Sequence, residues 1–572
     1  MPLAPLAPAL AALRAALAPG EAAALAATAG HFGSKPKVAA FLSVSDGSRR
    51  ATCASGVGNG LDAALKAARD RLRKLLPREA DWRWIKADLV RSVTPHAPAA
   101  LAAEIAATRR NYFRRGIAFD PGFETALLEQ ELLGIGGIGF DAEKRLVLRL
   151  DRIDRHLKSR RLPPLPPTPA ETWFSFETTG AFLDRAEPEV HRLVSGGFGN
   201  GIRAAPTARA DPFPLIEAAG LHLARQLGED GAFRYGFFPV NQEPIPTYNI
   251  LRHSSSLYAM LEAWEATGNA AIAERIPHGI DHVIRTALAE VGRYAVIVDR
   301  ANHDEVKLGA QAAFILAVTK YTALTGDERY LEHACRIAGS IVARFLDRET
   351  GSFVHVLDAT DLSVKEPFRI IYYDGEAVLA LLRLHAVDGE ELWLDAARLA
   401  FERFLGTDHW KHHDHWLAYA SNALTAFDPD RRYVEFGLRN AFGNIDFIHQ
   451  RDTAYPTFLE LLMATEEMVS RLRAGGEQVL TPEAEAKLLA TIHHRAEHNR
   501  YSHFYPELAM YFRAPGEIAG SFFIRHHGFR VRIDDVEHFI SGYCLYRRFL
   551  LANGAAWPPT GPVPSGGRGT GG

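Results

Sequence analysis

Clusters of carboxylates, histidines, arginines and aromatic residues recur after residue 240 of this sequence, each near the beginning of an apolar segment. Carboxylates and histidines are the side chains that most often donate and accept protons in catalysis. Arginines bind anionic groups, and aromatic rings stack on flat apolar surfaces. The clusters therefore predict a binding pocket in which protons are transferred. Their members are Tyr248, Asn249, Arg252 and His253; Lys307 and Gln311; Tyr373, Asp374 and Glu376; His415, Trp416 and Tyr419; Arg451, Asp452 and Tyr455; and Arg532, Asp534, Asp535 and His538.

Glycine-containing turns give the first three clusters a common register. Gly268, Gly326 and Gly389 each end an apolar segment, as glycine often does at the C-terminus of a helix. Because buried polar groups without partners cost free energy, we expect polar residues at equivalent helix starts to face a wet pocket. Counting back fifteen and nineteen residues from these glycines reaches His253, Gln311 and Asp374, and Asn249, Lys307 and Ile370.

The segments that carry the clusters belong to a unit that repeats between residues 211 and 552. Each unit has an amphipathic helix pattern, a short extended segment, and a more apolar helix pattern that ends at a turn. A helix that is apolar nearly all round must be enclosed, whereas one with a single apolar stripe covers it from outside. Six enclosed helices inside six covering ones predict a mainly α fold, an (α/α)6 barrel. An open solenoid is the alternative, but the count of six and the lack of a polar-faced capping repeat favour the ring.

The rest of the chain predicts a small α/β domain that precedes the barrel. Residues 1–30 are an alanine-rich leader, and residues 31–160 give two strands, a helix and a third strand. Clustered prolines and glycines mark residues 161–210 as a linker with bridging strands. Residues 553–572 have the composition of a disordered tail. We therefore expect the barrel domain, residues 211–552, to carry any catalysis.

Composition argues against several classes of function. A net charge of −3 gives no electrostatic reason to expect a nucleic acid partner, and we expect no membrane span. Three widely spaced cysteines cannot build a disulfide framework, and the histidine-rich segment HWKHHDHW lacks the spacing of a zinc site. The sequence thus predicts neither a metal nor a cofactor. It favours a cytoplasmic protein, with the periplasm as the alternative, and does not indicate an oligomeric state.

Short extended segments separate the paired helix patterns. RYGFFPV, RYAVIVD and SFVHVLD each precede an apolar helix pattern, and turns of the TGD type follow such patterns. In this position they resemble the short hairpins of the six-hairpin glycosidase superfamily. That superfamily includes glycoside hydrolases, unsaturated-glucuronyl hydrolases and the similarly folded N-acylglucosamine 2-epimerases. The resemblance covers residues 211–552 and implies a carbohydrate as the substrate.

Glycosidic bond cleavage in an oligo- or polysaccharide is the leading functional hypothesis. One carboxylic acid protonates the leaving oxygen while a second carboxylate activates water from the opposite face. Asp374 or Glu376, on the third inner helix, is expected to face Asp534 or Asp535, on the sixth. A substrate that contains uronate fits as well, because arginines are available to bind its carboxylate.

Sugar epimerisation or isomerisation is the alternative reaction, in which two bases flank one carbon. The 2-epimerase-like proteins use histidines at inner-helix starts with an arginine nearby, and His253, His415, His538 and Arg252 match that in type and placement. A third hypothesis is a non-catalytic protein that binds a glycan or acts as a scaffold in polysaccharide biosynthesis. Some of the polar residues also have a purely structural explanation, since Asp452 stands where a helix N-cap is expected.

Overall fold

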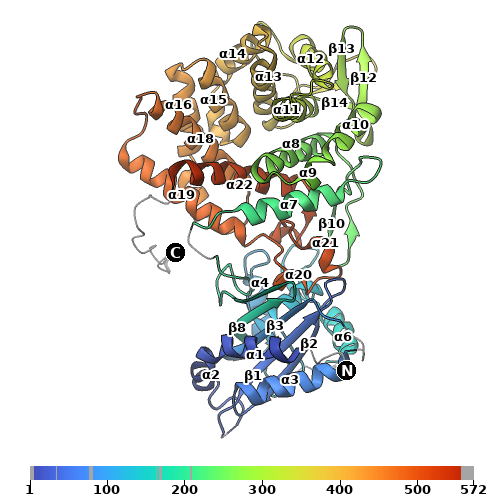
Figure 1. The fold of residues 1–572 in the computed structure, drawn as a ribbon, viewed down its shortest axis with the longest axis vertical. Coiled ribbons are helices and arrows are strands. Elements are labelled where there is room, and N and C mark those ends of the chain that lie inside the picture. Colours follow the sequence, from blue (N-terminus) through green and yellow to red (C-terminus); the bar gives the residue numbers. More distant parts are fainter. Residues whose placement is uncertain are drawn as a thin grey trace.

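In the computed structural model, which describes residues 6–33, 35–76, 81–162, 164–165, 170–205 and 209–554, the chain forms two domains. A strand-rich domain contains the N-terminal residues, and a ring of helices contains the C-terminal ones (Figure 1). Part of the proline-rich segment and residues 555–572 of the predicted tail lie outside the described residues.

Six long helices of the described chain form the inner ring of the barrel. Each packs against the next, and the last packs against the first, so the ring is closed. An open solenoid would leave the first and last helices apart. The predicted (α/α)6 barrel is therefore confirmed. The inner helices are α8 (Ile250–Thr267), α11 (Leu308–Thr325), α13 (Tyr372–Asp388), α15 (His415–Phe427), α18 (Thr457–Ala474) and α22 (Ile533–Asn553).

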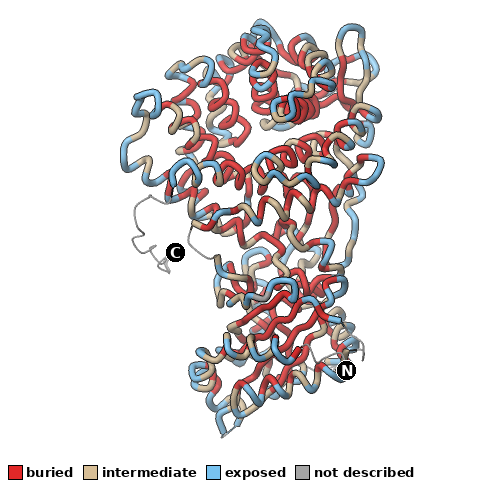
Figure 2. The backbone as a smooth tube through the Cα atoms, in the orientation of Figure 1, coloured by how far each residue is buried: buried red, intermediate tan, exposed pale blue. Residues whose placement is uncertain are grey.

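A second layer of helices covers the ring from outside. The inner helices are buried on nearly every side, whereas the outer ones alternate between buried and exposed faces (Figure 2). Their sequence patterns predict this difference. Gly268, Gly326 and Gly389 end α8, α11 and α13 in the left-handed conformation, at φ of 68°, 70° and 72°. The outer helices are α7 (Phe213–Gln226), α10 (Ile276–Ala287), α12 (Leu331–Ser340), α14 (Glu391–Gly406), α16 (Arg431–Phe442) and α19 (Pro482–Arg500).

Short strands lie where the inner helices begin. β10 (Gly236–Phe238), β13 (Tyr294–Ile297) and β15 (Val356–Asp358) fall within the three predicted extended segments. β14 (Glu305–Lys307) runs directly into α11, and β17 (Val531–Arg532) runs directly into α22. The strands therefore hold the first turns of these inner helices at one end of the barrel. Their remaining partners are β11 (Glu243–Pro244), β12 (Leu288–Val291) and β16 (Val364–Glu366).

A seven-stranded sheet, counted over the described residues, forms the centre of the N-terminal domain. α3 (Leu61–Leu75) packs on the first two strands, and α1 (Leu6–Leu17) packs on β3 and β8. The predicted order of two strands, a helix and a third strand is present in β1, β2, α3 and β3. The order in the sheet is β2 (Thr52–Gly58), β1 (Val38–Ser45), β3 (Trp84–His96), β8 (Trp173–Asp184), β4 (Gly116–Ala118) and β5 (Ala126–Leu127), with β9 (Glu187–Arg192) paired to β8. The smaller elements are α2 (Glu21–Ala27), α4 (Pro98–Ala107), α5 (Glu129–Gly134), α6 (Leu150–Ser159), β6 (Ile138–Phe140) and β7 (Leu146–Leu148).

Two of the expected domain boundaries differ from the structure. β8 and β9 lie within residues 161–210, for which the sequence predicts a linker with bridging strands, and β8 stands in the middle of the sheet and pairs along its length with β3. This pairing places Trp84 opposite Asp184, and contacts so distant in sequence leave no local pattern. The predicted leader buries Leu6, Leu13 and Leu17 in the core of the same domain. Both segments therefore belong to the N-terminal domain.

One helical stretch of the described chain, Leu6–Ala27, is long and apolar enough to cross a membrane, judged by length and composition alone. In the structure, residues 18–20 divide it into α1 and α2, and its leucines pack against the sheet. The expectation that no segment spans a membrane stays a prediction.

A connection of the barrel packs against the N-terminal domain. The segment between α19 and α22 contains α20 (Pro506–Ala509) and α21 (Pro515–Ile518) and lies at the junction of the domains (Figure 1). The Tyr511 hydroxyl donates a hydrogen bond of 2.9 Å to Ser43, and Arg525 forms a buried ion pair of 2.9 Å with Glu129. Gly134 lies so close to Tyr511 that a Cβ atom would stand 2.0 Å from its carbonyl oxygen. The two domains thus share a buried polar interface.

Candidate active site

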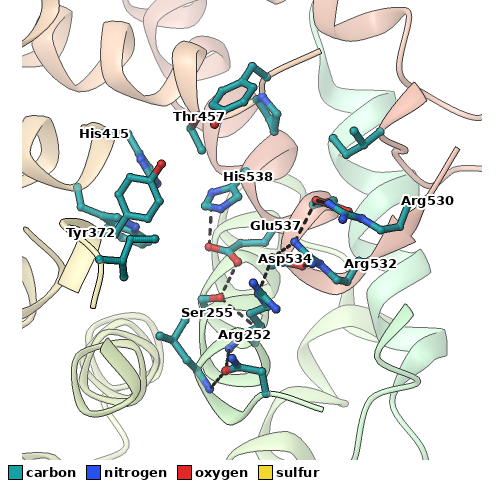
Figure 3. Close-up of a pocket in the computed structure, with 18 of the residues that line it drawn as sticks. Arg252, Ser255, Tyr372, His415, Thr457, Arg530, Arg532, Asp534, Glu537 and His538 are labelled. Carbon is teal, nitrogen blue, oxygen red and sulfur yellow. Dashed lines mark hydrogen bonds and ion pairs between the residues drawn. The ribbon is translucent and has the colours of Figure 1, made fainter. Parts of the chain in front are cut away.

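A cavity of about 330 Å³ opens at the end of the barrel where the inner helices begin. Its walls come from the first turns of α8, α13, α15 and α22, from the residues around the start of α18, and from the connection that precedes α22 (Figure 3). The volume lies at the lower end of the range for small-molecule pockets. The cavity is therefore the candidate active site.

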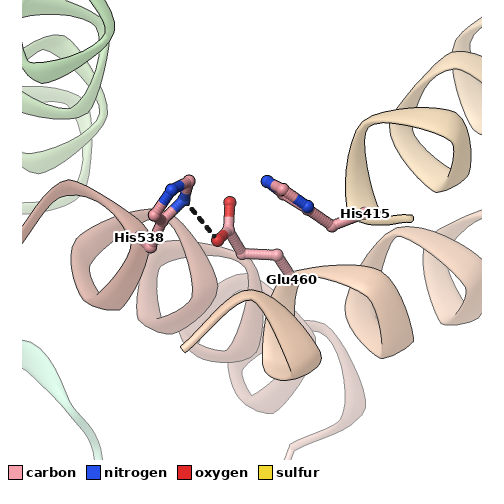
Figure 4. Close-up of side chains that lie close together, drawn as sticks. All are labelled: His415, Glu460 and His538. Carbon is pink, nitrogen blue, oxygen red and sulfur yellow. Dashed lines mark ion pairs between the residues drawn. The ribbon is translucent and has the colours of Figure 1, made fainter. Parts of the chain in front are cut away.

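His415, Glu460 and His538 come together at this end of the barrel (Figure 4). Three consecutive inner helices, α15, α18 and α22, supply them. The ring centroids of His415 and His538 are 5.1 Å apart, and the rings are nearly perpendicular. His538 Nδ1 lies 2.9 Å from Glu460 Oε1, and the Tyr419 hydroxyl donates a hydrogen bond of 3.1 Å to Glu460 Oε2. The Glu460 carboxylate is thus held from two sides and orients His538.

His538 lies among negative charges. Burial alone would lower its pKa, but the carboxylates of Glu537 and Glu460 hold the pKa of His538 well above its ordinary value. Glu537 Oε1 is 3.8 Å from His538 Nδ1, and Glu537 Oε2 accepts a hydrogen bond of 2.5 Å from Ser255. His538 is therefore an imidazolium at neutral pH and can donate a proton.

His415 is oriented as a proton acceptor. Its Nδ1 lies 3.1 Å from Oδ1 of Asp414, and the same carboxylate caps α15 by accepting from the backbone N–H groups of Trp416 and Leu417. A carboxylate at Nδ1 favours the tautomer that carries its proton there. The Nε2 atom of His415 is buried and has no hydrogen-bond partner among the described residues. This nitrogen therefore carries the lone pair of the ring that can accept a proton.

Glu376 is a buried acid in the same cavity. Burial and the nearby charges of Asp414 and Glu537 raise its pKa to about 8. Its Oε2 has no hydrogen-bond partner in the described part of the chain, and it lies against Gly309, where a Cβ atom would stand 2.2 Å away. At neutral pH Glu376 is protonated, so it can donate a hydrogen bond or a proton to a ligand.

Arginines and aspartates form another wall of the cavity (Figure 3). Asp535 accepts two hydrogen bonds of 2.8 Å from Arg530. Asp534 is paired with Arg532 at 2.7 Å and with Arg252 at 2.8 Å. Although burial opposes this, the two arginines hold the pKa of Asp534 below its ordinary value. Both aspartates are thus engaged by arginines, which makes them poor candidates for a free acid and base.

The structure brings some of the predicted site residues together in the cavity and leaves the others outside it. Those that line it are Glu376, His415, Asp534, Asp535, His538, Asn249, Arg252, Tyr373, Trp416, Tyr455 and Arg532. Those that do not line it are Asp374, His253, Tyr248, Lys307, Gln311, Tyr419, Arg451 and Asp452.

Two of the outlying residues were expected to be catalytic. His253 is fully buried, and its two ring nitrogens contact the Tyr248 hydroxyl at 2.7 Å and the Gly279 carbonyl at 3.0 Å. Gly279 belongs to the outer helix α10, so His253 points away from the barrel axis. Asp374 lies 3.4 Å from His355, on the connection before α13. Neither residue is placed to reach a ligand in the cavity.

The outlying residues expected to bind substrate have partners elsewhere. Lys307 forms an ion pair of 2.7 Å with Asp299, and Gln311 makes hydrogen bonds to the backbone of β13. Arg451 donates to a neighbouring threonine side chain, and Asp452 lies 3.8 Å from an arginine of the N-terminal domain. These contacts are structural, because they stabilise the short strands at the beginning of the inner helices and the junction of the two domains.

Sequence reasoning missed several residues of the site, above all Glu460 and Glu537. Glu460 is a lone carboxylate in the apolar run FLELLMA, and a buried carboxylate needs a partner, so a signal was present. α18 begins at Thr457 and has Glu460 in its first turn, beyond the predicted cluster of Arg451, Asp452 and Tyr455. Glu537 follows Asp534 by three positions, so both lie near the same face of α22.

His415, Glu460 and His538 are also the one group of described residues with the geometry to hold a metal ion. Their ligand atoms lie within 4.8 Å of one another. Two histidines and a carboxylate suit several divalent transition metals. A cation there would have to replace the 2.9 Å contact between His538 and Glu460. The prediction that the protein needs no metal is therefore left to a chelation experiment.

Comparisons with known proteins find distant structural matches and no sequence match. No family model matches the chain, and no curated protein matches its sequence. Among solved structures, a D-mannose isomerase is 11% identical with a TM-score of 0.47, and the match covers 61% of this chain and 100% of that one. A cellobiose 2-epimerase from Bacillus thermoamylovorans is 12% identical with a TM-score of 0.44, covering 58% and 98%. A family 76 glycoside hydrolase from a bovine Bacteroides thetaiotaomicron strain is 10% identical with a TM-score of 0.44, covering 82% and 96%. At these identities the likeness concerns the fold alone.

Proposed function

We propose that this protein is a carbohydrate-active enzyme that epimerises or isomerises a sugar by moving a proton at a carbon beside a carbonyl group. The supporting observation is the pair of His415 and His538 in one cavity, one with a free acceptor nitrogen and the other positively charged. This choice reverses the order expected from the sequence. Asp534 and Asp535 are engaged by arginines, and Asp374 lies outside the cavity.

The chemistry follows from the different surroundings of the two histidines. Nε2 of His415 takes the proton from the carbon next to the carbonyl of the open-chain sugar, and the C–H electron pair becomes the double bond of an enediolate. The neutral carboxyl of Glu376 can donate a hydrogen bond to the oxygen that becomes negative. His538 then delivers its proton to the same carbon from the other face for the epimer, or to the neighbouring carbon for the isomer. In the second case the hydroxyl proton of the enediolate also moves to the other oxygen, so that the new carbonyl group can form. Both histidines return to their first states by exchange with water.

The lining of the cavity supports a sugar as the ligand. Tyr372, Trp416 and Tyr455 line it and offer flat apolar faces for the apolar face of a sugar ring. Asn249 and Ser255 line it as well and offer polar groups to hydroxyls. Aromatic surface together with a few polar groups is the usual composition of a small-molecule pocket.

The experiment is incubation in D2O with neutral and uronate mono- and disaccharides, followed by NMR. We expect deuterium at the carbon beside the carbonyl, together with the epimer or isomer. His415→Asn and His538→Asn are each expected to lower the exchange rate by about a hundredfold or more, which is the usual contribution of general acid–base catalysis. His412→Asn, at an exposed position before α15, is the matched control. New reducing ends without carbon-bound deuterium would contradict the proposal.

Treatment with a chelator separates acid–base catalysis from metal catalysis at the same residues. If the histidines themselves exchange protons, dialysis against EDTA leaves the rate unchanged. A loss of activity that a divalent cation restores would identify His415, Glu460 and His538 as metal ligands instead.

Glycosidic bond cleavage is the second candidate, because Glu376 has the raised pKa of a general acid. Glu537 is a second buried carboxyl that lines the cavity, although burial raises its pKa to about 8 as well, which disfavours it as the base. Cleavage predicts that Glu376→Gln abolishes the formation of reducing ends. It also predicts that no deuterium enters the carbon skeleton, so the same D2O samples distinguish the two reactions.

A further inference from the structure

Two more cavities continue the candidate active site into the junction of the domains. The first, of about 290 Å³, shares His527 with the active-site cavity. The second, of about 440 Å³, shares Arg152, Val240 and Asn241 with the first. Because neighbouring cavities have wall residues in common, they lie side by side and lead away from the histidine pair. We call the two added cavities the junction cleft.

The junction cleft is lined by basic residues and, among the described residues, by no aspartate or glutamate. Arg149 and Arg152 line the first of its cavities, and Arg152 recurs in the second beside Arg50, Arg155 and Arg513. The whole chain has a net charge of −3, so this positive excess is local. A cleft with charges of one sign attracts ligands of the opposite sign.

Three of the five arginines of the cleft retain free donors among the described residues, whereas Arg50 donates to three backbone carbonyls and Arg155 is paired with Asp151. Arg513 donates to the carbonyl of Asn241 at 2.9 Å, and Arg152 donates to the side chain of the same residue at 3.5 Å. Arg149 donates to a backbone carbonyl of β6. A guanidinium has five N–H donors, so most of those on these three arginines are available to a ligand. Bidentate contacts of this kind suit carboxylates and phosphates.

His527 lines both the junction cleft and the active-site cavity, and its neighbour His526 lines the active-site cavity alone. His526 lines the cavity with 8% of its surface exposed, and its Nδ1 has no hydrogen-bond partner among the described residues. Burial and the positive charges of His527, Arg110 and Arg451 lower the pKa of His526 to about 3. Arg110 belongs to the N-terminal domain, so both domains contribute positive charge beside this opening.

We propose that the junction cleft binds the anionic groups of a glycan chain, carboxylates or phosphates, while the unit that reacts lies at His415 and His538. The inference rests on the proposed function for the reacting unit and extends it to the class of substrate. It also gives the N-terminal domain a role, because that domain supplies one side of the cleft.

The test is binding of short and long uronic acid oligomers, measured by calorimetry beside neutral oligosaccharides of equal length. Affinity is expected to rise with length in the charged series only, and to fall as salt rises from about 50 to about 200 mM. Arg149→Gln/Arg152→Gln is expected to weaken binding of the long uronates by about tenfold or more, because charge-assisted hydrogen bonds are lost. The same double variant should leave deuterium exchange into a monosaccharide unchanged. Phosphate-bearing oligosaccharides, run in parallel, identify which anionic group binds more tightly.

Two further variants keep the test specific. Arg348→Gln/Arg431→Gln removes two charges from exposed barrel positions and is the matched control, which should bind as the natural protein does. Arg149→Lys/Arg152→Lys retains the charges but loses the paired donors of the guanidinium, so it should restore only a part of the affinity. If the glutamine pair fails to fold, the single variants replace it.

The result is separable from the proposed reaction. Equal binding of charged and neutral oligomers, or binding that the arginine variants leave unchanged, overturns the inference even where deuterium exchange is observed. Equal affinity for single-stranded RNA of the same charge overturns the assignment to a glycan. Charge-dependent uronate binding without any deuterium exchange retains the cleft and removes the proposed reaction.

Discussion

Replacement of Glu376 by glutamine tests the electrostatics of the site quantitatively. Burial and the charges of Asp414 and Glu537 raise the pKa of this carboxyl from 4.5 to about 8. The unfolded chain releases the proton of Glu376 above pH 4.5, whereas the folded protein releases it only above about pH 8. The folded state therefore binds more protons within this window, and the free energy of unfolding falls as the pH rises through it. At about 1.4 kcal/mol for each pH unit, the loss reaches about 5 kcal/mol as an upper limit.

Glu376→Gln removes the titrating group and with it this loss. Relative to the natural protein, the variant is expected to gain several kcal/mol of stability between about pH 5 and about pH 9. Urea unfolding at the two pH values measures the gain, and any pH-independent change in contacts cancels in the comparison. Glu274→Gln, at an exposed position, is the control. A difference between Glu376→Gln and the natural protein that is the same at both pH values would refute the buried neutral acid.

Three further predictions concern packing and charge. Gly309→Ala places a methyl group 2.2 Å from the buried carboxyl of Glu376. We expect it to lower the free energy of unfolding in urea by about 1–3 kcal/mol and to slow deuterium exchange. Gly406→Ala, with open space at its Cβ, is the control and should be tolerated. His538→Gln removes the cation between two carboxylates and should cost about 3 kcal/mol at pH 6. The pKa of His538 is raised in the folded protein, so its contribution to the free energy of unfolding is complete below pH 6.5, the ordinary pKa. The contribution is lost as the pH rises through the raised pKa. A cost of the substitution that grows with pH would therefore contradict the assignment. Arg525→Leu leaves Glu129 without one of its buried partners at the domain junction and should lower the free energy of unfolding by about 3 kcal/mol; an unchanged urea midpoint would show that the pair contributes little.

The barrel could be predicted from sequence because its signals are local. The difference between all-round and one-sided apolar helices separates the two layers, and Gly268, Gly326 and Gly389 mark the ends of three inner helices. The N-terminal sheet was predicted only in part. β8 pairs with β3 across a long stretch of chain, and such pairing depends on tertiary contacts that no short pattern encodes.

The candidate site was predicted less well, because a count from a turn locates the start of a helix but not the face that points to the axis. Position fifteen before the turn gave His253 and Asp374, which point toward outer elements. The cavity is lined instead by Leu251, Arg252 and Ser255 of α8 and by Asn249, which precedes the helix and was reached by the count of nineteen. The role of Glu460 depends on contacts from two other helices, which sequence alone cannot supply.

The most direct test of the account is the rate of deuterium incorporation in D2O by the natural protein, His415→Asn and His538→Asn, with a sugar that the natural protein converts. The account predicts deuterium at the carbon beside the carbonyl with the natural protein, and a rate lower by about a hundredfold or more in each variant. Conversion without carbon-bound deuterium, or equal rates in the three proteins, would contradict proton transfer by the histidine pair.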